Sequence, residues 1–436
     1  MLAGRLATRE VSAVEVARET LERIRDARDL NAFAAVDEDA VMAQAAERDA
    51  GPPSGPLHGV PIAVKDNIDV AGLPTRAGSR VLPAEPAEAD AAVVARMRAA
   101  GAVIVGKTTM HELALGVINP GVGNPRLPGQ VAGGSSGGSG AAVAAGLAAG
   151  ALGTDTGGSV RLPAAFCGCA GLRPTTGTVP ADGALPLSWS HDTIGPLAAT
   201  VGDVAVLHAV IAGWDPGAVA AGARRERPPR LVLWTGDPHP IDPEVAAAFE
   251  AAVLAVRAAG MLTVERPIPD LDAIADLQIR IAGPEATAST AAHLGVAPGT
   301  PAFEAATEGL TDDVRAIVRA DPGSAADHVT AIRVESARVV ARLAADLDGA
   351  DAILTPVSPA PPPAVGVGDW VEIDGERRRT FFGLSHFATS ASVAGAPALA
   401  IPCAAPGIGV QLIGRPGADA DLLALGMEVE AALRAA

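Results

Sequence analysis

Residues 133–163 constrain the fold of this chain more than any other stretch. Two glycine-rich segments, at 133–140 and 153–159, flank a run made only of Ala, Gly, Val and Leu. Alanine favours helix, and small side chains let neighbouring backbone approach closely. We therefore expect a buried helix over about residues 138–150 and the start of a strand over residues 151–154. A helix followed by a reversal of the chain would bring the two glycine-rich segments close together.

These two segments contain the residue types of a site for acyl transfer. Glycines have no side chain to cover their backbone N–H groups, so several accessible N–H groups can converge on a developing oxyanion. Serines beside them can act as nucleophiles if a base removes the hydroxyl proton. The residue types alone do not decide which serine attacks.

The two lysines of the chain are the candidate bases. Lys65 and Lys107 are the only lysines among the 33 Lys and Arg residues, so arginine serves wherever a simple cation is enough. Arginine stays protonated, whereas a desolvated lysine can lose its proton near neutral pH. Each lysine follows an apolar run that we expect to be a strand, and α/β enzymes place their chemistry at strand ends.

Several longer motifs resemble those of the amidase signature family. The resemblance is dense over residues 59–213, is sparse over residues 215–350 and returns near the C-terminus. The matching stretches are residues 59–67, 106–108, 110–112, 133–139, 153–161, 171–175, 192–196 and 411–416. They are long and occur in the family's order, so chance explains them poorly.

The resemblance implies a Ser–Ser–Lys triad. In that triad Ser159 is the acyl nucleophile, and neutral Lys65 is the general base. Ser135, which follows an unusual cis peptide bond, bridges the two. The oxyanion hole that the resemblance implies consists of the backbone N–H groups of Thr156, Gly157, Gly158 and Ser159. The expected reaction is hydrolysis of the C–N bond of a linear carboxamide through an acyl-enzyme on Ser159.

Four further residues are expected to support this site. Ser136 is expected to hydrogen-bond within it, and Lys107 to orient loops or to hold the polar network. Asp155 is expected to accept hydrogen bonds from the loops, and Arg161 fits a structural ion pair better than it fits a substrate carboxylate. Neither a metal site nor a cofactor is expected, because no histidine, cysteine or carboxylate spacing matches a metal motif.

Two other functions stay open. Residues 134–138 also satisfy Gly-x-Ser-x-Gly, the nucleophile elbow, in which Ser136 would attack with His191 or His386 as its base. That elbow should follow a strand, and residues 119–132 make a poor one. The family also supplies the glutaminase (A) subunit of a tRNA-dependent amidotransferase, which delivers ammonia to partner subunits. The short chain and its divergent 270–400 region favour a stand-alone enzyme.

The composition argues against several other classes of protein. A net charge of −17 disfavours direct binding to nucleic acid or to an anionic membrane. The three cysteines, Cys167, Cys169 and Cys403, form neither a zinc pattern nor a disulfide framework, which indicates a reducing compartment. We find neither the apolar core of a signal peptide nor an unbroken apolar run of the length a membrane span needs, so we expect a cytoplasmic location. The expected partners are a small-molecule amide substrate and, in a homo-oligomer, copies of the same chain.

The order of the expected elements is that of an α/β protein. The family resemblance implies one α/β/α amidase domain over residues 1–436, with a central mixed sheet covered by helices on both faces. Its family-matching core spans about residues 59–213 and 390–436, and a variable, mostly helical substrate region spans about residues 270–350. A linker is expected over residues 215–230. The expected strands are residues 60–64, 102–105, 231–234, 262–266, 351–355, 397–402 and 409–413, and the expected helices are residues 12–28, 37–50, 89–100, 200–212, 243–259 and 419–435.

One further group of residues is a candidate for lining the substrate pocket. It consists of the proline-rich segment 356–363 and the aromatic residues Trp370, Phe381, Phe382 and Phe387. Aromatic residues make up only 3% of the chain, so this grouping stands out. A plain core patch explains it equally well.

Overall fold

A central sheet of eleven strands organises the molecule. The computed structural model describes residues 2–221 and 227–436. In chain order the strands of this sheet are β1 (Phe33–Ala35), β2 (Pro61–Lys65), β3 (Val103–Thr108), β4 (Gly150–Asp155), β5 (Ala170–Arg173), β6 (Thr193–Ala198), β7 (Arg230–Thr235), β8 (Leu262–Pro267), β9 (Ala352–Pro356), β12 (Ala398–Pro402) and β13 (Gly409–Ile413). Their order across the sheet is β1-β3-β2-β4-β6-β5-β12-β13-β9-β7-β8.

The sheet is mixed and draws strands from both halves of the chain. Strand β2 runs parallel to β3 and β4, and β7 runs parallel to β8 and β9. The strands between these two parallel groups pair antiparallel. Because β12 and β13 from the C-terminal end lie between β5 and β9, the chain after residue 230 returns to the same sheet. The predicted mixed sheet is confirmed.

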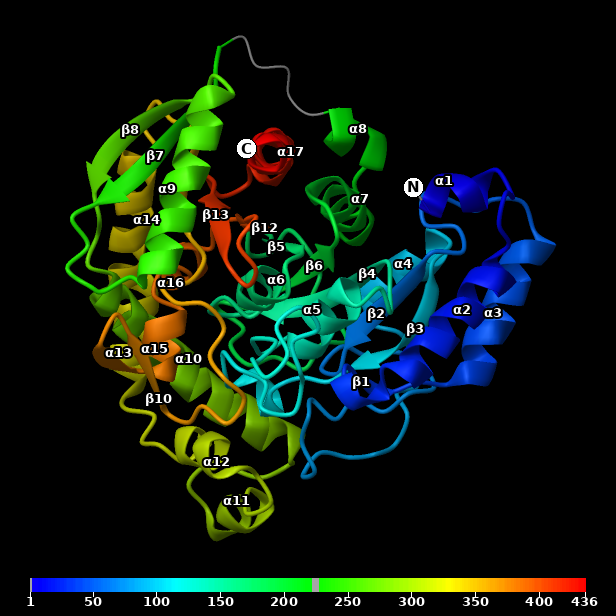
Figure 1. Ribbon diagram of the computed structural model, residues 1–436. Helices are drawn as coiled ribbons and strands as arrows, with labels where there is room; N and C mark the ends of the chain where they lie inside the picture. The colour runs from blue at the N-terminus through cyan, green and yellow to red at the C-terminus, as the bar shows by residue number, and fades with distance from the viewer. Residues whose placement is uncertain (1, 222–226) are drawn as a thin grey trace.

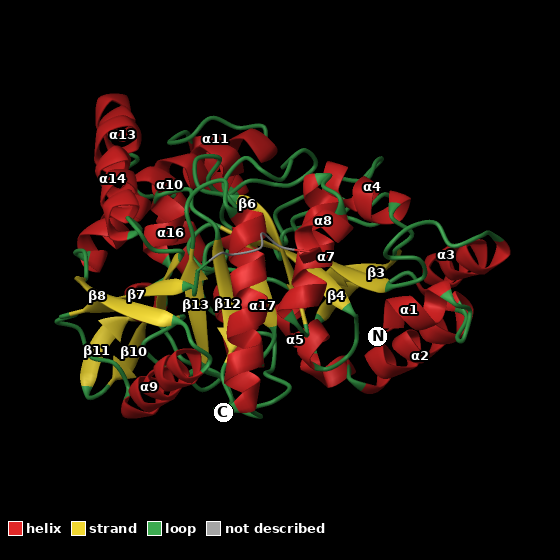
Figure 2. Ribbon diagram, turned by 90° about the horizontal axis from the view of Figure 1, so that it is seen from above, coloured by secondary structure: helices red, strands yellow, loops and turns green. Residues whose placement is uncertain are grey.

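Helices pack on both faces of this sheet (Figure 1). The helices of the described part are α1 (Leu2–Ala7), α2 (Ala13–Asp26), α3 (Glu38–Ala50), α4 (Ala92–Ala99), α5 (Gly137–Ala144), α6 (Arg161–Cys167), α7 (Val201–Ala212), α8 (Pro216–Ala221), α9 (Pro243–Ala258), α10 (Leu271–His293), α11 (Pro301–Ala306), α12 (Asp312–Val318), α13 (Ala325–Thr330), α14 (Ser336–Asp346), α15 (Thr380–Leu384), α16 (Thr389–Val393) and α17 (Asp419–Ala435). A separate two-stranded hairpin pairs β10 (Trp370–Ile373) with β11 (Glu376–Arg379). Figure 1 shows helices α10 to α14 gathered along one side of the molecule, and Figure 2 shows α10, α11, α13 and α14 of this group from above. None of the described helices is long and apolar enough to cross a membrane.

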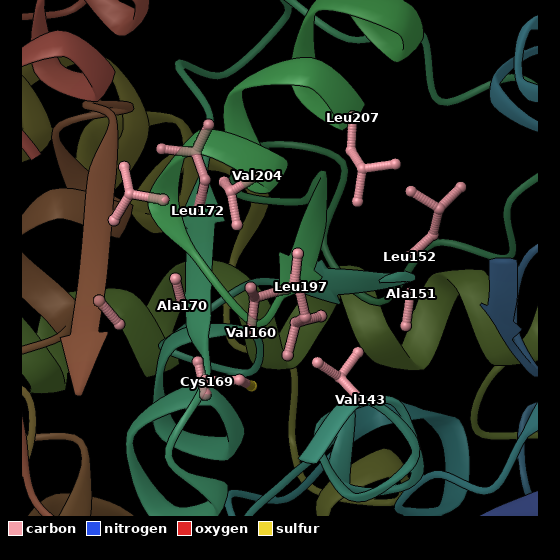
Figure 3. Packing of buried hydrophobic residues seen from close by; sticks show 14 of the residues in the cluster. Val143, Ala151, Leu152, Val160, Cys169, Ala170, Leu172, Leu197, Val204 and Leu207 are labelled. Carbon is pink, nitrogen blue, oxygen red and sulfur yellow. The ribbon is translucent and has the colours of Figure 1, made fainter. Parts of the chain in front are cut away.

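The core beside the glycine-rich segments is built from small aliphatic side chains. Figure 3 shows Val204 and Leu207 of α7 on one face of the strands and Val143 of α5 on the other, with Leu152 and Leu197 between them. Leu152 and Leu197 have no measurable exposure. Truncating a leucine packed in this way typically costs about 2–5 kcal/mol of stability.

The structure corrects several element boundaries predicted from the sequence. The helix expected over residues 138–150 ends at Ala144, because Gly146 has a left-handed φ of 68° that closes the helix. The expected linker over residues 215–230 begins with α8, where Pro216 occupies the first position, a place that suits proline. Residues 222–226 of that linker lie outside the described residues. Strands β5 and β6, helix α6 and the β10–β11 hairpin have no counterpart among the predicted elements.

Candidate active site

The sheet places Lys65 beside the second glycine-rich segment. Strands β2 and β4 are parallel neighbours, with Val64 opposite Leu152, so their carboxyl ends meet at one edge of the sheet. Lys65 is the last residue of β2, and Thr154 lies at the end of β4. The Lys65 Nζ atom donates to Thr154 Oγ1 at 2.7 Å and to Ser135 Oγ at 2.8 Å.

Lys65 is fully buried. Burial disfavours its charged form and lowers its pKa to about 7, although the negative charges of Asp192 and Asp155 oppose that change. At neutral pH a large fraction of the Lys65 side chains therefore carries a free electron pair. A lysine in this state can accept a proton from a hydroxyl group, which an arginine cannot do.

The two glycine-rich segments lie against each other. The Ser136 N–H donates to the Ser159 carbonyl at 3.2 Å, and Ser136 Oγ donates to the Thr154 carbonyl at 3.2 Å. The peptide bond between Gly134 and Ser135 is cis. Gly138 must be a glycine because a Cβ there would come within 2.4 Å of the Thr109 carbonyl oxygen. The reversal expected after the small-residue helix thus brings the two glycine-rich segments together, and Ser135 reaches Lys65.

Asp155 is the centre of a buried network behind the second segment. Its carboxylate accepts hydrogen bonds from the Gly158 and Val160 N–H groups and from the side chain of Arg161. Arg173 Nη1 lies 3.3 Å from the same carboxylate. Burial raises the pKa of Asp155, but the two guanidinium groups and the N–H donors outweigh burial and hold that pKa well below its usual range. The carboxylate therefore stays charged and fixes the backbone of residues 155–160.

One of the four expected oxyanion donors is already engaged. The Gly158 N–H donates to Asp155 Oδ1, 2.9 Å away, so this amide already has a partner within the protein. Within the described residues, the N–H groups of Thr156, Gly157 and Ser159 donate to no other group. Gly158 has a φ of 113°, which only glycine adopts readily, and this conformation turns the chain before Ser159.

Lys107 lies apart from the serines. It is buried at the end of β3, and its Nζ atom donates to Thr75 Oγ1 at 2.9 Å and to the Pro74 carbonyl at 3.1 Å. Asp66, the residue after Lys65, is 3.5 Å from the same nitrogen. Lys107 therefore ties the segment around residues 74–75 to the chain that carries Lys65.

Three residues of the site were missed by the sequence analysis. Gln278 of α10 is buried and donates from Nε2 to the Thr156 carbonyl at 2.7 Å. Asp192 accepts a hydrogen bond from Thr156 Oγ1 at 2.5 Å. Glu285 accepts from the hydroxyl groups of Ser188 and Ser190 and so orders the loop that carries Asp192. Asp192 lies in a family-matching stretch, but no sequence signal links Gln278 or Glu285 to residues more than 90 positions away.

The histidines named for the elbow mechanism have other partners. His386 Nε2 lies 2.8 Å from Asp237 Oδ2. His191 Nδ1 lies 3.4 Å from Ser188 Oγ, and burial lowers the pKa of His191 to about 3. Within the described residues, neither imidazole hydrogen-bonds to Ser136, so the structure offers Ser136 no histidine base.

The four aromatic residues do not form one cluster. Trp370 is 43% exposed, and the guanidinium of Arg377 lies 4.8 Å from its ring. Phe381 and Phe382 contact each other edge to face, and Phe387 contacts the ring of His386. The role of these rings in a substrate pocket stays a prediction.

Comparison with known proteins identifies the family. The sequence model of the family described as Amidase matches residues 15–423. The chain belongs to this family. A Pseudomonas putida protein named amidase is 37% identical over 460 residues, which cover 99% of this chain and 95% of the relative. A Koribacter versatilis protein, named as the A subunit of glutamyl-tRNA(Gln) amidotransferase, is 34% identical over 470 residues, covering 98% of this chain and 96% of that protein.

A solved structure of the family has the same fold. A crystal structure described as an amidase superimposes with a TM-score of 0.89 at 34% identity and covers 99% of both chains. The predicted family, the α/β/α fold with its mixed sheet, and the enzyme class are confirmed. The protein is an amidase-family hydrolase that acts on amide C–N bonds.

Proposed function

We propose that the protein is a stand-alone amidase that cleaves linear carboxamides through an acyl-enzyme on Ser159. The observation that carries this proposal is the buried Lys65, whose pKa is lowered to about 7 and whose Nζ lies 2.8 Å from Ser135 Oγ. A buried lysine beside a serine, at the edge where two glycine-rich segments meet, supplies a base for a hydroxyl nucleophile.

In the proposed reaction, Ser135 relays the proton of Ser159 to neutral Lys65. Ser159 Oγ attacks the amide carbonyl carbon, the C–N bond breaks, and an ester forms on Ser159. The relayed proton goes to the leaving ammonia or amine. Water then attacks the ester, loses a proton by the same route and releases the carboxylic acid, which restores the free Ser159 hydroxyl.

The proposed oxyanion hole consists of the N–H groups of Thr156, Gly157 and Ser159. These amides have no partner among the described residues, and the segment that carries them is held by Asp155 on one side and by Gln278 on the other. Donors that are fixed before the reaction stabilise a developing negative charge without reorganisation. We assign Ser136, Asp155, Arg161 and Lys107 the role of holding this arrangement.

We further propose that residues 1–436 act as one amidase domain, with the family core at about 59–213 and 390–436. The continuous sheet supports this proposal, as does the helical content of residues 270–350. We place the enzyme in the cytoplasm, since its three cysteines are unpaired. Its proposed partner is a small amide, with further copies of the chain in a homo-oligomer.

A second candidate function is the glutaminase component of a tRNA-dependent amidotransferase. It is favoured by one observation, the similarity to an amidotransferase component of this kind over nearly the full length of both chains. The two candidates differ in their need for partners. Glutaminase activity that appears only when partner subunits are added would support the second candidate, whereas amide hydrolysis by the purified chain alone would support the first.

The deciding experiment is labelling of the purified protein with a fluorophosphonate, followed by peptide mass spectrometry. We expect an adduct on Ser159 in the wild type and labelling reduced by about 1,000-fold or more in Lys65→Ala and Lys65→Arg, because arginine cannot act as the base. Circular dichroism spectra of the variants would verify that they fold. An adduct on Ser136 that survives the loss of Lys65 would overturn the proposed triad.

A further inference from the structure

A group of metal-ligating side chains lies outside the candidate active site. Asp237 and His239 follow β7, and His386 follows α15, almost 150 positions later in the chain. One ligand atom from each of the three residues lies within 4.8 Å of the others. The two imidazole rings meet edge to face, with their centroids 4.8 Å apart.

His386 has an unsatisfied nitrogen in this group. The residue is 2% exposed, and its Nδ1 atom has no hydrogen-bond partner among the described residues. Its other nitrogen, Nε2, faces Asp237 Oδ2 at 2.8 Å. Because Nε2 is the nitrogen that contacts another possible ligand, we take Nε2 as the metal-binding atom of His386, which leaves Nδ1 on the outer side of the ring.

Asp272 at the start of α10 provides an outer carboxylate, that is, one that contacts the two histidines from outside the group of three. Its oxygens lie 3.1 Å from His239 Nε2 and 3.6 Å from His386 Nδ1. Histidines that bind a metal through one nitrogen commonly donate their other N–H to a carboxylate, which fixes the ring. Arg378 also binds both oxygens of Asp272 at 2.8 Å, so Asp272 is held in place and its charge is balanced.

We infer that Asp237, His239 and His386 form a binding site for a divalent transition-metal ion, with Asp272 as the outer carboxylate. Two imidazoles and one carboxylate suit Zn²⁺, whereas Ca²⁺ and Mg²⁺ prefer ligand sets made of oxygen. Bond lengths of about 2.0–2.1 Å place tetrahedral ligands roughly 3.3 Å apart, so the ligand atoms, which lie within 4.8 Å of one another, would move closer together on binding. No metal motif is visible in the sequence because the ligands come from segments that only the fold brings together.

The inferred site would anchor a segment that supports the catalytic loop. Directly after His386, the carbonyl of Phe387 accepts a hydrogen bond from Gln411 at 2.7 Å, and the carbonyl of Ala388 accepts one from Arg161 at 2.8 Å. The Ala388 side chain also packs against Gly158. An ion on His386 would therefore join the end of β7 to the residues behind the oxyanion loop, as a structural site.

The test uses the full chain after treatment with a chelator. Calorimetric titration with Zn²⁺ should give one ion per chain, and Co²⁺ should give the intense visible absorption of a tetrahedral complex. Asp237→Asn and His239→Ala should each weaken Zn²⁺ binding by at least about tenfold. His239 is partly exposed, so its replacement preserves the fold better than replacement of the buried His386.

The matched control is His293→Ala, which removes a histidine whose Nδ1 lies 2.8 Å from the Ser289 carbonyl and which stands at the opposite end of α10 from Asp272. This variant should bind Zn²⁺ as the wild type does. Absence of stoichiometric binding to the wild type would overturn the inference. Equal binding by wild type, Asp237→Asn and His239→Ala would overturn it as well, because the ion would then lie elsewhere. Neither result depends on amidase activity.

Discussion

Lys65 experiences two opposing influences. Its burial lowers the pKa towards neutrality, while the buried carboxylates of Asp192 and Asp155 raise it again. Asp155 is neutralised by two guanidinium groups, whereas Asp192 is held mainly by hydrogen bonds from Thr156 and from the backbone of residues 187–188. Asp192 is therefore the carboxylate through which the working pH range of the site can be altered.

Replacing Asp192 by asparagine should shift the acid limb of the pH profile to lower pH. In the wild type, the rate of fluorophosphonate labelling should rise through about pH 7 as Lys65 loses its proton. Asparagine removes the negative charge that raises the pKa of Lys65, so the neutral base forms at lower pH. The measurement is the labelling rate at a series of pH values.

Asp182→Asn provides the control for that shift. It makes the same change of charge at an exposed position, where solvent and salt screen the effect. Its profile should match that of the wild type. An Asp192→Asn profile that is unshifted or displaced to higher pH would contradict the account of Lys65 given above.

Gln278 acts on the site through a neighbouring carbonyl group. Gln278→Met keeps the length of the side chain but leaves the buried Thr156 carbonyl without its donor, so the oxyanion amides should lose their alignment. We expect Ser159 labelling to slow by about tenfold, which corresponds to the loss of one hydrogen bond. Ile279→Ala changes an exposed residue of the same helix and should leave the rate unaltered; equal rates for both variants would contradict this role for Gln278.

At the scale of single elements, local side-chain contacts explain where helix α2 starts. Helix α2 begins after Ser12, whose hydroxyl accepts from the Glu15 N–H, while the Glu15 side chain accepts from the Ser12 N–H. This reciprocal pair satisfies two backbone groups that the first turn leaves free. The interaction is local, because both residues lie at the start of the helix.

Ser12→Ala should therefore lower stability without affecting the site. We expect a loss of about 1 kcal/mol in the free energy of unfolding, measured by urea titration, with an unchanged rate of Ser159 labelling. Ser12→Asp should retain most of the stability, because aspartate also caps helices. Equal stability of the alanine variant and the wild type would show that the cap contributes nothing in this context.

At the scale of the whole molecule, Arg161 joins parts of the chain that are far apart. From the start of α6 it pairs with Asp155 and also donates to the Ala388 carbonyl and to Gln411 Oε1 in β13. All of these groups are buried. One side chain thus connects the loop after β4 to the C-terminal strands of the sheet.

Arg161→Met should destabilise the protein by about 3–5 kcal/mol at neutral pH, because it leaves a buried carboxylate short of a cation. Arg280→Met breaks an ion pair with Glu335 at the surface and should cost less than about 1 kcal/mol. Urea unfolding of both variants provides the comparison. Similar losses in the two variants would contradict the central role of Arg161.

The ion pair between Asp155 and Arg161 predicts that the stability of the protein depends on pH. The pKa of Asp155 is lower in the folded protein than in the unfolded chain, so its contribution to stability is present above pH about 4 and is lost as the pH falls through the folded-state pKa. The stability difference between the wild type and Arg161→Met should therefore shrink in acid. A difference that stays constant from pH 7 to pH 3 would contradict this assignment.

The sequence by itself determined the family, the alternation of strands and helices, and the residues of the proposed triad. It could do so because these features rest on local patterns: apolar runs ending at Lys65 and Lys107, and glycine-rich motifs in a fixed order. The end of helix α5 at Ala144 was misplaced and helix α8 was missed, because the conformation of Gly146 and the helix start at Pro216 leave only weak local signals.

Only the tertiary structure decided which distant groups meet. Strand β5 has only four residues, and both β5 and β6 contain glycine; they become strands because neighbours on both sides pair with them. The contact of Gln278 with Thr156 and the approach of His386 to Asp237 are likewise invisible in the sequence. Each is a contact between segments that are far apart in the sequence. Their positions along the chain do not indicate which of them meet in the folded protein.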